Sequence, residues 1–412
     1  MNDQTLAIHG ALDATRFAGA TVPPVFQTVA YASPSAQGMA DAFAGSGAGY
    51  VYTRIANPTT VALEGALAEL EQGIGCVATA SGMAAIHAVA AALLAAGDEI
   101  VAAEGIFAGT VSLFENTLKR FGVTIRYVDA CDARQVAGAI TGRTRFVFVE
   151  TIGNPKLDSP DIAQLSQITR EAGIPLVVDN TVATPSLCKP GSLGADIVVH
   201  STSKFISGGG TTIGGAVIDT GNFDWLSGPC SHISSRYGSA GRMALLAYLR
   251  NVAVRDLGAC PAPWNSFLTL EGLKTLGPRM DRHCDNAKAL AKFLQGHPAV
   301  KWVNYPMLPG AVAYAMAARQ LGGKGGGLLT LGLGGKEAAW RLIDALKLAK
   351  NVANLGDVRT LVIHPASTIC REFDASSRMR MGVTDDMVRV SVGIEDVEDI
   401  RGDFARALEE LT

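Results

Sequence analysis

The chain has 412 residues, of which 48% are hydrophobic and 18% are charged, and its formal net charge is −3. This length is sufficient for two domains with a large core, and the composition is that of a folded protein rather than a disordered one. The small negative charge argues against nucleic acid or an anionic membrane as a partner.

The first residues, the longest apolar run and the cysteines indicate where in the cell we expect the protein. The first residues contain no basic segment followed by an apolar core, so we expect no signal peptide. The longest apolar run, 84–96, contains His87 and is too short to cross a bilayer. The seven cysteines stand singly, which predicts reduced thiols, no disulfide framework, no metal site and a cytoplasmic location.

The predicted elements change character at about residue 61. Residues 1–60 are rich in Ala, Gly, Thr and Pro and show few helical patterns, whereas helices are predicted over 61–71 and 83–95. Polar-faced helices then alternate with short apolar strands, predicted at 99–102, 124–128, 145–149, 175–179, 196–200 and 213–218. Such alternation indicates an α/β domain with a mostly parallel sheet covered on both faces. We assign this domain to 61–256 and a smaller C-terminal domain, which begins with a long helix over 269–295, to 257–412.

Lys204 stands four residues after the apolar run 197–200, among short hydroxyl side chains, with three glycines at 208–210 close behind. An arbitrary lysine at a strand end is usually a surface residue. Here the apolar strand and small neighbours indicate a buried amine, as a lysine that forms a Schiff base with an aldehyde cofactor requires. We predict that Lys204 carries pyridoxal phosphate (PLP) and moves protons between substrate carbons once the substrate amine displaces it.

Asp179 ends the apolar strand predicted at 175–179. Alone, such an aspartate is as easily explained as the cap of the following helix. Together with Lys204 it favours a PLP site, because a carboxylate beside the pyridine nitrogen keeps the ring cationic and able to accept electrons from Cα.

Three segments are candidates for binding the phosphate. Residues 81–83, Ser-Gly-Met, begin a predicted helix, whose N-terminal backbone N–H groups suit an anion. Ser201 and Ser203 add hydroxyls beside Lys204. The loop 50–59 contains Tyr52 and Arg54, which belong either to a surface turn or to a clamp on the phosphate.

Five motifs occur in one order: Tyr-x-Arg-x-x-Asn-Pro-Thr at 52–59, Ser-Gly-Met-Ala-Ala at 81–85, Glu-Thr-Ile-Gly-Asn-Pro at 150–155, Val-Asp-Asn-Thr at 178–181 and His-Ser-Thr-Ser-Lys at 200–204. Together they resemble the Cys/Met-metabolism PLP enzymes, the cystathionine γ-synthase-like group of fold type I. The resemblance extends from about His9 to the C-terminus. It implies a mostly parallel central sheet with helices on both faces, a smaller C-terminal α/β domain and an extended N-terminal arm, 1–60.

The resemblance also implies roles for individual residues. Tyr52 and Arg54 would reach the phosphate in a neighbouring subunit, so the active unit would be at least a dimer and usually a dimer of dimers. Gly82 and Met83 would donate backbone N–H groups to the phosphate, and Asn154 would contact the phenolic oxygen of the cofactor. The expected cofactor-binding residues are Tyr52, Arg54, Gly82, Met83, Phe107, Asn154, Asp179, Thr181, Ser201, Ser203 and Lys204.

Within this family the chain is most similar to the sulfhydrylases that act on O-acetylhomoserine, through segments 210–219, 221–225, 354–357, 361–368 and 388–395. Arg389 matches the arginine that binds the substrate α-carboxylate, and its place inside an apolar strand favours a bound partner over a surface ion pair. Asn354 stands where lyases and synthases of the group usually carry serine. This favours the sulfhydrylase, and we expect Asn354 to bind substrate as well.

Some positions depart from the family pattern. Phe107 stands where a tyrosine is normal: its ring can stack on the pyridine, but it has no hydroxyl for proton transfer to the leaving group. Another donor or water then serves, or the reaction differs. Gly209 stands where sulfhydrylases usually have histidine, and the segment 370–373 also differs. Gly109 stands where methionine γ-lyases carry a cysteine, which counts against that activity.

We therefore expect a PLP-dependent γ-replacement with Lys204, Asp179 and Phe107 as catalytic residues. O-acetyl-L-homoserine, or another O-acylhomoserine, would react with sulfide or a thiol to give homocysteine or methionine and the free acid. Methionine γ-lyase and cystathionine γ-synthase activities are alternatives, as is a similar reaction on a specialised substrate. A binding protein that has lost catalysis is disfavoured by the intact Lys204, Asp179, Arg54 and Arg389.

Overall fold

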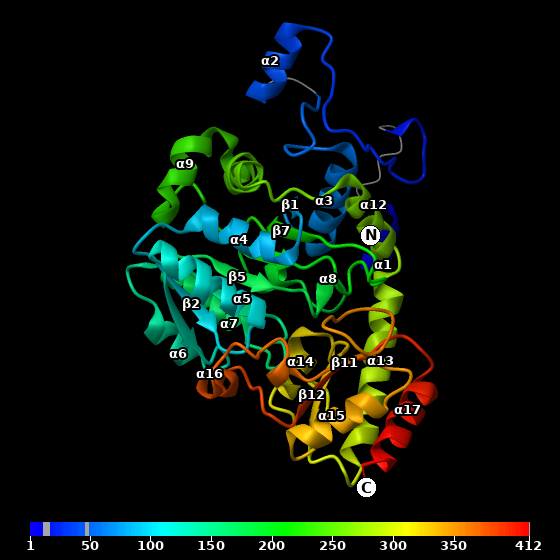
Figure 1. Cartoon of the computed structure of the whole chain (residues 1–412). Helices are drawn as coiled ribbons and strands as arrows, with labels where there is room; N and C mark the ends of the chain where they lie inside the picture. Colours follow the sequence, from blue (N-terminus) through cyan, green and yellow to red (C-terminus); the bar gives the residue numbers. More distant parts are fainter. Residues whose placement is uncertain (11–16, 46–48, 412) are drawn as a thin grey trace.

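The computed structural model describes residues 1–10, 17–45 and 49–411, so parts of the expected arm, 11–16 and 46–48, lie outside the described residues. Figure 1 shows a large lobe, a smaller C-terminal lobe below it, and an N-terminal segment with α2 (Ala36–Ala44) that projects away from both. In the described part of the chain, no helix combines the length and apolarity needed to cross a membrane.

The large lobe is built on a seven-stranded sheet in the order β1-β7-β6-β5-β4-β2-β3. Strands β2 to β6 run parallel to one another, whereas β7 is antiparallel to both of its neighbours. The predicted mostly parallel sheet is therefore confirmed, with one reversed strand near an edge. The strands are β1 (Gly75–Thr79), β2 (Glu99–Ala103), β3 (Thr124–Val128), β4 (Thr144–Glu150), β5 (Leu176–Asp179), β6 (Ile197–His200) and β7 (Gly215–Asp219).

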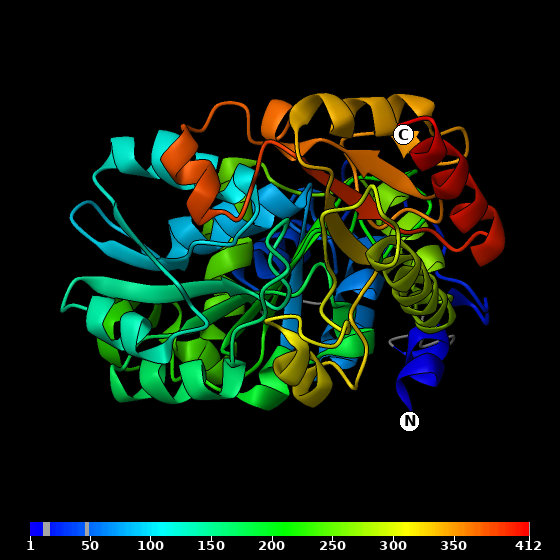
Figure 2. The same cartoon turned by 90° about the horizontal axis from the view of Figure 1, so that it is seen from below.

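Helices cover both faces of this sheet, as Figure 2 shows from below. Helix α3 (Pro58–Glu71) begins where Asn57 caps it and Pro58 occupies its first turn, and α4 (Gly82–Leu93) begins at a Ser81 cap. Both lie where the sequence predicts helices. The other helices of this lobe are α5 (Ala108–Ser112), which continues into a π-helical turn over Leu113–Leu118, α6 (Ala133–Ala139), α7 (Ile162–Glu171), α8 (Thr184–Leu187), α9 (Ser231–Tyr237), α10 (Ala244–Tyr248) and α11 (Arg255–Leu257).

The C-terminal lobe contains a second sheet in the order β10-β11-β12-β9-β8. Its strands are β8 (Trp302–Asn304), β9 (Leu328–Gly332), β10 (Lys350–Asn351), β11 (Leu361–Ile363) and β12 (Met387–Ser391). Helices α13 (Leu276–Gln295) and α15 (Lys336–Ala345) pack against its strands, and α17 (Val397–Glu409) packs against both helices. The lobe also contains α14 (Tyr314–Gln320) and α16 (Ala375–Arg380).

The single long helix predicted over 269–295 is wrong. The chain forms α12 (Pro263–Leu273) and then α13, with Lys274 and Thr275 between them. Pro278 explains the break, because proline is tolerated in the first turn of a helix but not in its interior.

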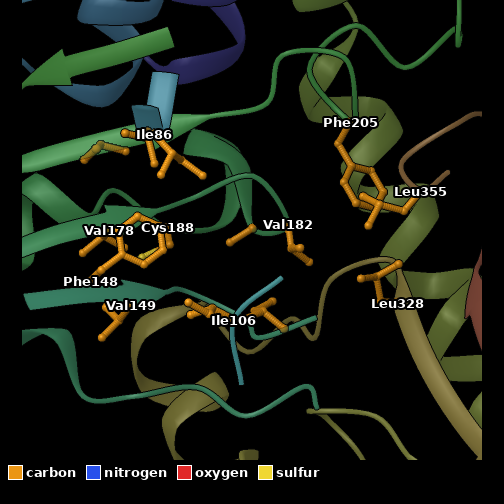
Figure 3. Close-up of a cluster of buried hydrophobic side chains, with 14 of the residues drawn as sticks. Ile86, Ile106, Phe148, Val149, Val178, Val182, Cys188, Phe205, Leu328 and Leu355 are labelled. Atoms are coloured by element: carbon orange, nitrogen blue, oxygen red, sulfur yellow. The ribbon is translucent and has the colours of Figure 1, made fainter. Parts of the chain in front are cut away.

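The two lobes share one continuous apolar core. Figure 3 shows buried side chains of the large lobe, such as Phe148 and Val178, continuing through Val182 to Phe205, with Leu328 and Leu355 of the C-terminal lobe beside it. The relative placement of the lobes is therefore set by buried apolar contacts rather than by a flexible linker.

Candidate active site

A cavity of about 470 Å³ lies where the two lobes meet, at the carboxyl ends of β4, β5 and β6. Open α/β sheets bind ligands at this edge. Most of the predicted site residues line the cavity, and Tyr52 and Arg54 do not: the lining includes Gly82, Met83, Phe107, Asn154, Asp179, Thr181, Ser201, Ser203, Lys204, Asn354 and Arg389.

Lys204 presents its amine to this cavity from the loop after β6. Its Nζ donates a hydrogen bond to Asn354 Oδ1 at 2.6 Å. Burial, together with the positive charge of Arg389, lowers the pKa of Lys204 to about 8. A substantial fraction of the amine is therefore neutral and nucleophilic near neutral pH, as attack on an aldehyde requires.

A glycine brings the C-terminal loop against the lysine. Gly356 has a φ of +72°, and a Cβ there would lie 2.5 Å from Phe205 N and 2.9 Å from Lys204 C. Only glycine allows this approach. It brings Asn354, two residues earlier, within hydrogen-bonding distance of an amine that is 150 residues away in sequence.

Asp179 ends β5 and lines the same cavity as Lys204. Its Oδ1 accepts a hydrogen bond from Thr181 N at 2.9 Å, and burial raises the pKa of its carboxyl. A buried carboxylate gains most from a cationic partner, because a positive charge offsets the lost hydration. A protonated pyridine nitrogen would be such a partner.

The N-terminus of α4 forms an anion site of the expected kind. Ser81 Oγ accepts from Ala84 N, which leaves the N–H groups of Gly82 and Met83 without partners inside the helix. A Cβ at Gly82 would lie 2.5 Å from Ser201 Cβ, so only glycine lets the helix end and Ser201 approach so closely. Ser203 faces the cavity too, but its hydroxyl already bonds with the backbone of Gly214.

Arg389 projects from β12, and its guanidinium is held on two sides. Nη1 donates to Asn154 Oδ1 at 3.0 Å, and Nη2 donates to the backbone oxygen of Asn354 at 2.9 Å. Its Nε is buried and has no partner among the described residues. Burial lowers the pKa of Arg389 to about 10, so the group stays cationic and is oriented to receive a carboxylate.

Glu150 is a cavity residue that the sequence analysis placed in a motif but gave no role. Its Oε1 accepts from Phe107 N at 2.7 Å and its Oε2 accepts from Asn154 N at 3.1 Å. Burial, and secondarily the charge of neighbouring Asp179, raises the pKa of Glu150. One side chain thus positions the backbone of two expected site residues. Its place at the end of β4, beside the end of β5, was the signal that could have revealed it.

Tyr52 and Arg54 lie away from the cavity of their own chain. Arg54 donates from Nη1 to the backbone oxygen of Arg255 at 2.7 Å, and its guanidinium lies 5.4 Å from the centre of the Tyr52 ring. Tyr52 is 40% exposed. Their role at the phosphate of a neighbouring subunit stays a prediction.

The residues fit PLP in each of its parts. Lys204 offers an amine to the aldehyde, Asp179 a carboxylate to the ring nitrogen, and the end of α4 a set of N–H donors to the phosphate. The buried, partly unpaired guanidinium of Arg389 adds a place for the carboxylate of an amino acid.

Comparisons with known proteins agree with this fit. Residues 4–409 match the family model of Cys/Met metabolism PLP-dependent enzymes. A structure from Campylobacter jejuni, assigned as an O-acetylhomoserine (thiol)-lyase and carrying N'-pyridoxyl-lysine-5'-monophosphate, superposes with a TM-score of 0.91 and 33% identity over 99% of this chain and 100% of that one.

Two relatives with different activities have similar sequence identity to this chain. The O-acetyl-L-homoserine sulfhydrylase of Leptospira meyeri is 38% identical over 99% of this chain and 97% of its own length. The L-methionine gamma-lyase of Pseudomonas putida is 37% identical over 98% of this chain and 96% of its own length. Overall identity alone therefore does not separate replacement from elimination.

Proposed function

We propose, from the premise that this chain belongs to the family of Cys/Met metabolism PLP-dependent enzymes, that it catalyses γ-replacement on O-acetyl-L-homoserine or another O-acylhomoserine. Sulfide or a thiol would replace the acyloxy group, giving homocysteine or methionine and the free acid. The observation that carries the proposal is the convergence of Lys204, Asp179 and Arg389, from two lobes, on one cavity.

When bound, PLP supplies an electron sink for the electrons released at the substrate carbons. Asp179 supports that sink by holding a proton at the ring nitrogen. Phe107, in the cavity wall, offers its ring as a stacking surface. The end of α4, with Gly82 and Met83, and the hydroxyl of Ser201 would hold the phosphate. Ser203 would join them by exchanging its bond to the Gly214 oxygen for one to the phosphate, and Thr181 would support Asp179 through its backbone N–H.

Lys204 moves the protons. Once free, its ε-amine would take the proton from Cα, deliver it to the carbon through which the bound cofactor holds the substrate amine, and, neutral again, take a proton from Cβ. The hydrogen bond to Asn354 Oδ1 holds this amine in one place while it does so. The depressed pKa of Lys204, about 8, makes the neutral and therefore basic form of this amine far more available at neutral pH than it is for an ordinary lysine.

Arg389 orients the substrate. Its Nε and the free hydrogens of its guanidinium would bind the α-carboxylate, while Asn154 and the backbone of Asn354 hold the group from the other side. The amino acid is thereby fixed by its carboxylate at one end and by its amine at the other, so that Cα and Cβ face Lys204. The acyloxy group leaves Cγ, and sulfide adds to the same carbon.

A second copy of the chain completes the site in this proposal. Tyr52 and Arg54 of the partner subunit would reach the phosphate, and the exposed Val29 and Phe43 of the arm would be covered in the assembly. We propose a dimer as the active unit, two of which form a tetramer, and a cytoplasmic location. Sedimentation of the PLP-loaded protein measures the assembly directly; a monomer with full activity would refute it.

The decisive experiment is a substrate-by-nucleophile assay on the PLP-loaded protein. O-acetylhomoserine, O-succinylhomoserine and methionine are each supplied with sulfide, with methanethiol and with cysteine, and the amino-acid products are separated and measured. Homocysteine from an O-acylhomoserine and sulfide supports the proposal. Cystathionine as the main product would replace it with a synthase.

A further inference from the structure

The described residues that line the cavity include no Tyr, His or Cys side chain. The titratable side chains among them are Glu150, Asp179, Lys204 and Arg389. This inventory bears on the leaving group, because side chains that deliver a proton to a departing atom come from these residue types.

Three of the four titratable groups are committed elsewhere. Arg389 stays cationic and bonds with Asn154 and Asn354. Asp179 accepts from Thr181 N and faces the expected ring nitrogen. The two oxygens of Glu150 are both directed at backbone N–H groups, those of Phe107 and Asn154, so this carboxyl holds the cavity wall in place rather than facing a leaving group.

Lys204 is the remaining group, and it already serves as the base. Having taken a proton from Cβ, its ammonium must return that proton to carbon in a replacement reaction. Among the described lining residues, no second acidic side chain is therefore free to protonate the leaving atom at the same time.

The rest of the wall does not supply one. Phe107, Ile213 and Ile369 contribute only carbon atoms. The hydroxyl of Thr212 faces the backbone oxygen of Asn265, at 3.4 Å. In the proposed dimer, Tyr52 of the partner subunit is expected at the phosphate. It therefore adds no acidic side chain near the leaving group.

We infer that this site acts on homoserine derivatives as esters and spares thioethers such as methionine, because it has no separate acid for the leaving group. The inference rests on the proposed function and names its substrate class. Carboxylic acids have pKa values of about 4 and thiols of about 8.5, so a carboxylate departs without a proton far more readily than a thiolate does.

Without an acid, the step must release the leaving group as an anion, and this is favourable only for an ester. Lys204 takes the Cβ proton, the electron pair of that C–H bond forms the Cβ–Cγ double bond, and the Cγ–O bond breaks with both its electrons on the oxygen. The products are a carboxylate ion and protonated Lys204. With methionine the same step would release an unprotonated alkyl thiolate into a largely apolar wall, where a charge is poorly solvated.

The first test uses the PLP-loaded wild-type protein without a nucleophile. Elimination gives 2-oxobutyrate from either substrate class, and we expect kcat with O-acetylhomoserine to exceed kcat with methionine by at least about a hundredfold. Methionine is still expected to bind, to compete with the ester and to change the visible absorbance of the cofactor. Cleavage of methionine within tenfold of the ester would overturn the inference, and so would a failure of methionine to bind, since poor fit would then explain its rejection.

The second test adds the missing hydroxyl. Phe107→Tyr places a hydroxyl in the wall, and Val182→Thr, a matched control, places one at another lining position. We expect Phe107→Tyr to raise methionine elimination about tenfold or more relative to ester elimination, and Val182→Thr to leave that ratio unchanged. A Phe107→Tyr protein that keeps its cofactor absorbance and gains nothing contradicts the inference.

A third measurement needs no variant. A series of homoserine esters with increasingly basic carboxylate leaving groups should show elimination rates that fall steeply with leaving-group pKa in the wild type, and a flat series would overturn the inference. Failure of the proposed function has a different signature, namely no homocysteine from any ester with sulfide, whatever the ratio between esters and methionine.

Discussion

The cavity and the N-terminal segment differ in how far a single chain satisfies their side chains. In the cavity, Lys204, Asp179, Arg389 and Glu150 each have a hydrogen-bond partner within the chain. In the N-terminal segment, α2 contains no buried residue, and Val29 and Phe43 are 62% and 69% exposed. The chain organises the reacting groups by itself and leaves the arm's apolar side chains for another surface to cover.

Because of this difference, we expect substitutions in the cavity and substitutions in the arm to have different effects. Substitutions in the cavity should alter the chemistry while assembly and stability persist. Substitutions in the arm should weaken cofactor retention and assembly while the chemistry of the loaded enzyme persists.

The largest effect is expected from Lys204→Ala. Because both the attachment of the cofactor and the movement of protons depend on this amine, turnover should fall by more than about a thousandfold and the visible absorbance band should be lost. Lys189→Ala removes a similarly shielded lysine, paired with Asp3 outside the cavity, and should keep both. Substantial turnover by Lys204→Ala would contradict the conclusion that this cavity contains the reacting groups.

Asp179→Asn should lower kcat by about a hundredfold, because an amide cannot hold a proton at the ring nitrogen. Asp196→Asn is the matched control. Asp196 is also buried, and burial raises its pKa to about 6. Its carboxyl accepts a hydrogen bond from Leu176 N, at the end of β5 opposite to Asp179. If the two variants lose activity equally, the effect belongs to folding rather than to the site.

The rate at which the cofactor-free protein captures PLP should rise about tenfold between pH 7 and pH 9. The pKa of Lys204 is lowered to about 8, so the neutral amine that attacks the aldehyde is a minor form at pH 7 and the major form at pH 9. The growth of the visible band measures the rate. Nα-acetyl-lysine, with its ordinary pKa, should show its rise at higher pH, and an identical profile for the two would contradict the depressed pKa.

The smallest effect is expected in the arm. Arg54→Ala removes one charged contact with the phosphate of a neighbouring site and should weaken PLP retention several-fold, with kcat at saturating PLP nearly unchanged. Dialysis followed by absorbance measures retention, and Arg134→Ala, at a side chain that is 94% exposed, serves as control. A large loss of kcat at full PLP occupancy would mean that the arm takes part in the chemistry.

The strand-end groups were the most predictable part of the molecule. An apolar strand followed by a single polar side chain placed Asp179 and Lys204 at one edge of a parallel sheet, and both line the cavity. The same rule applied to the strand at 145–149 points to Glu150, which the sequence analysis left without a role because a motif drew attention to Asn154 instead.

Long-range contacts were out of reach of local patterns. The bond between Lys204 and Asn354 joins residues 150 positions apart, and it depends on a backbone approach that only Gly356 permits. The division of the predicted long helix into α12 and α13 was missed for the opposite reason. Pro278 marks the start of a second helix, because proline is tolerated in the first turn and not in the interior, and the expectation of one helix over 269–295 ignored this signal.

Asn354 divides its contacts between side chain and main chain, and this affects how freely the position can evolve. The side chain meets Lys204, whereas the contact with Arg389 uses the backbone oxygen, which every amino acid possesses. Replacing Asn354 would therefore disturb the restraint on the amine without dismantling the carboxylate anchor. Natural variation or laboratory selection at position 354 could therefore change how Lys204 moves protons, while Arg389 continues to bind the substrate carboxylate.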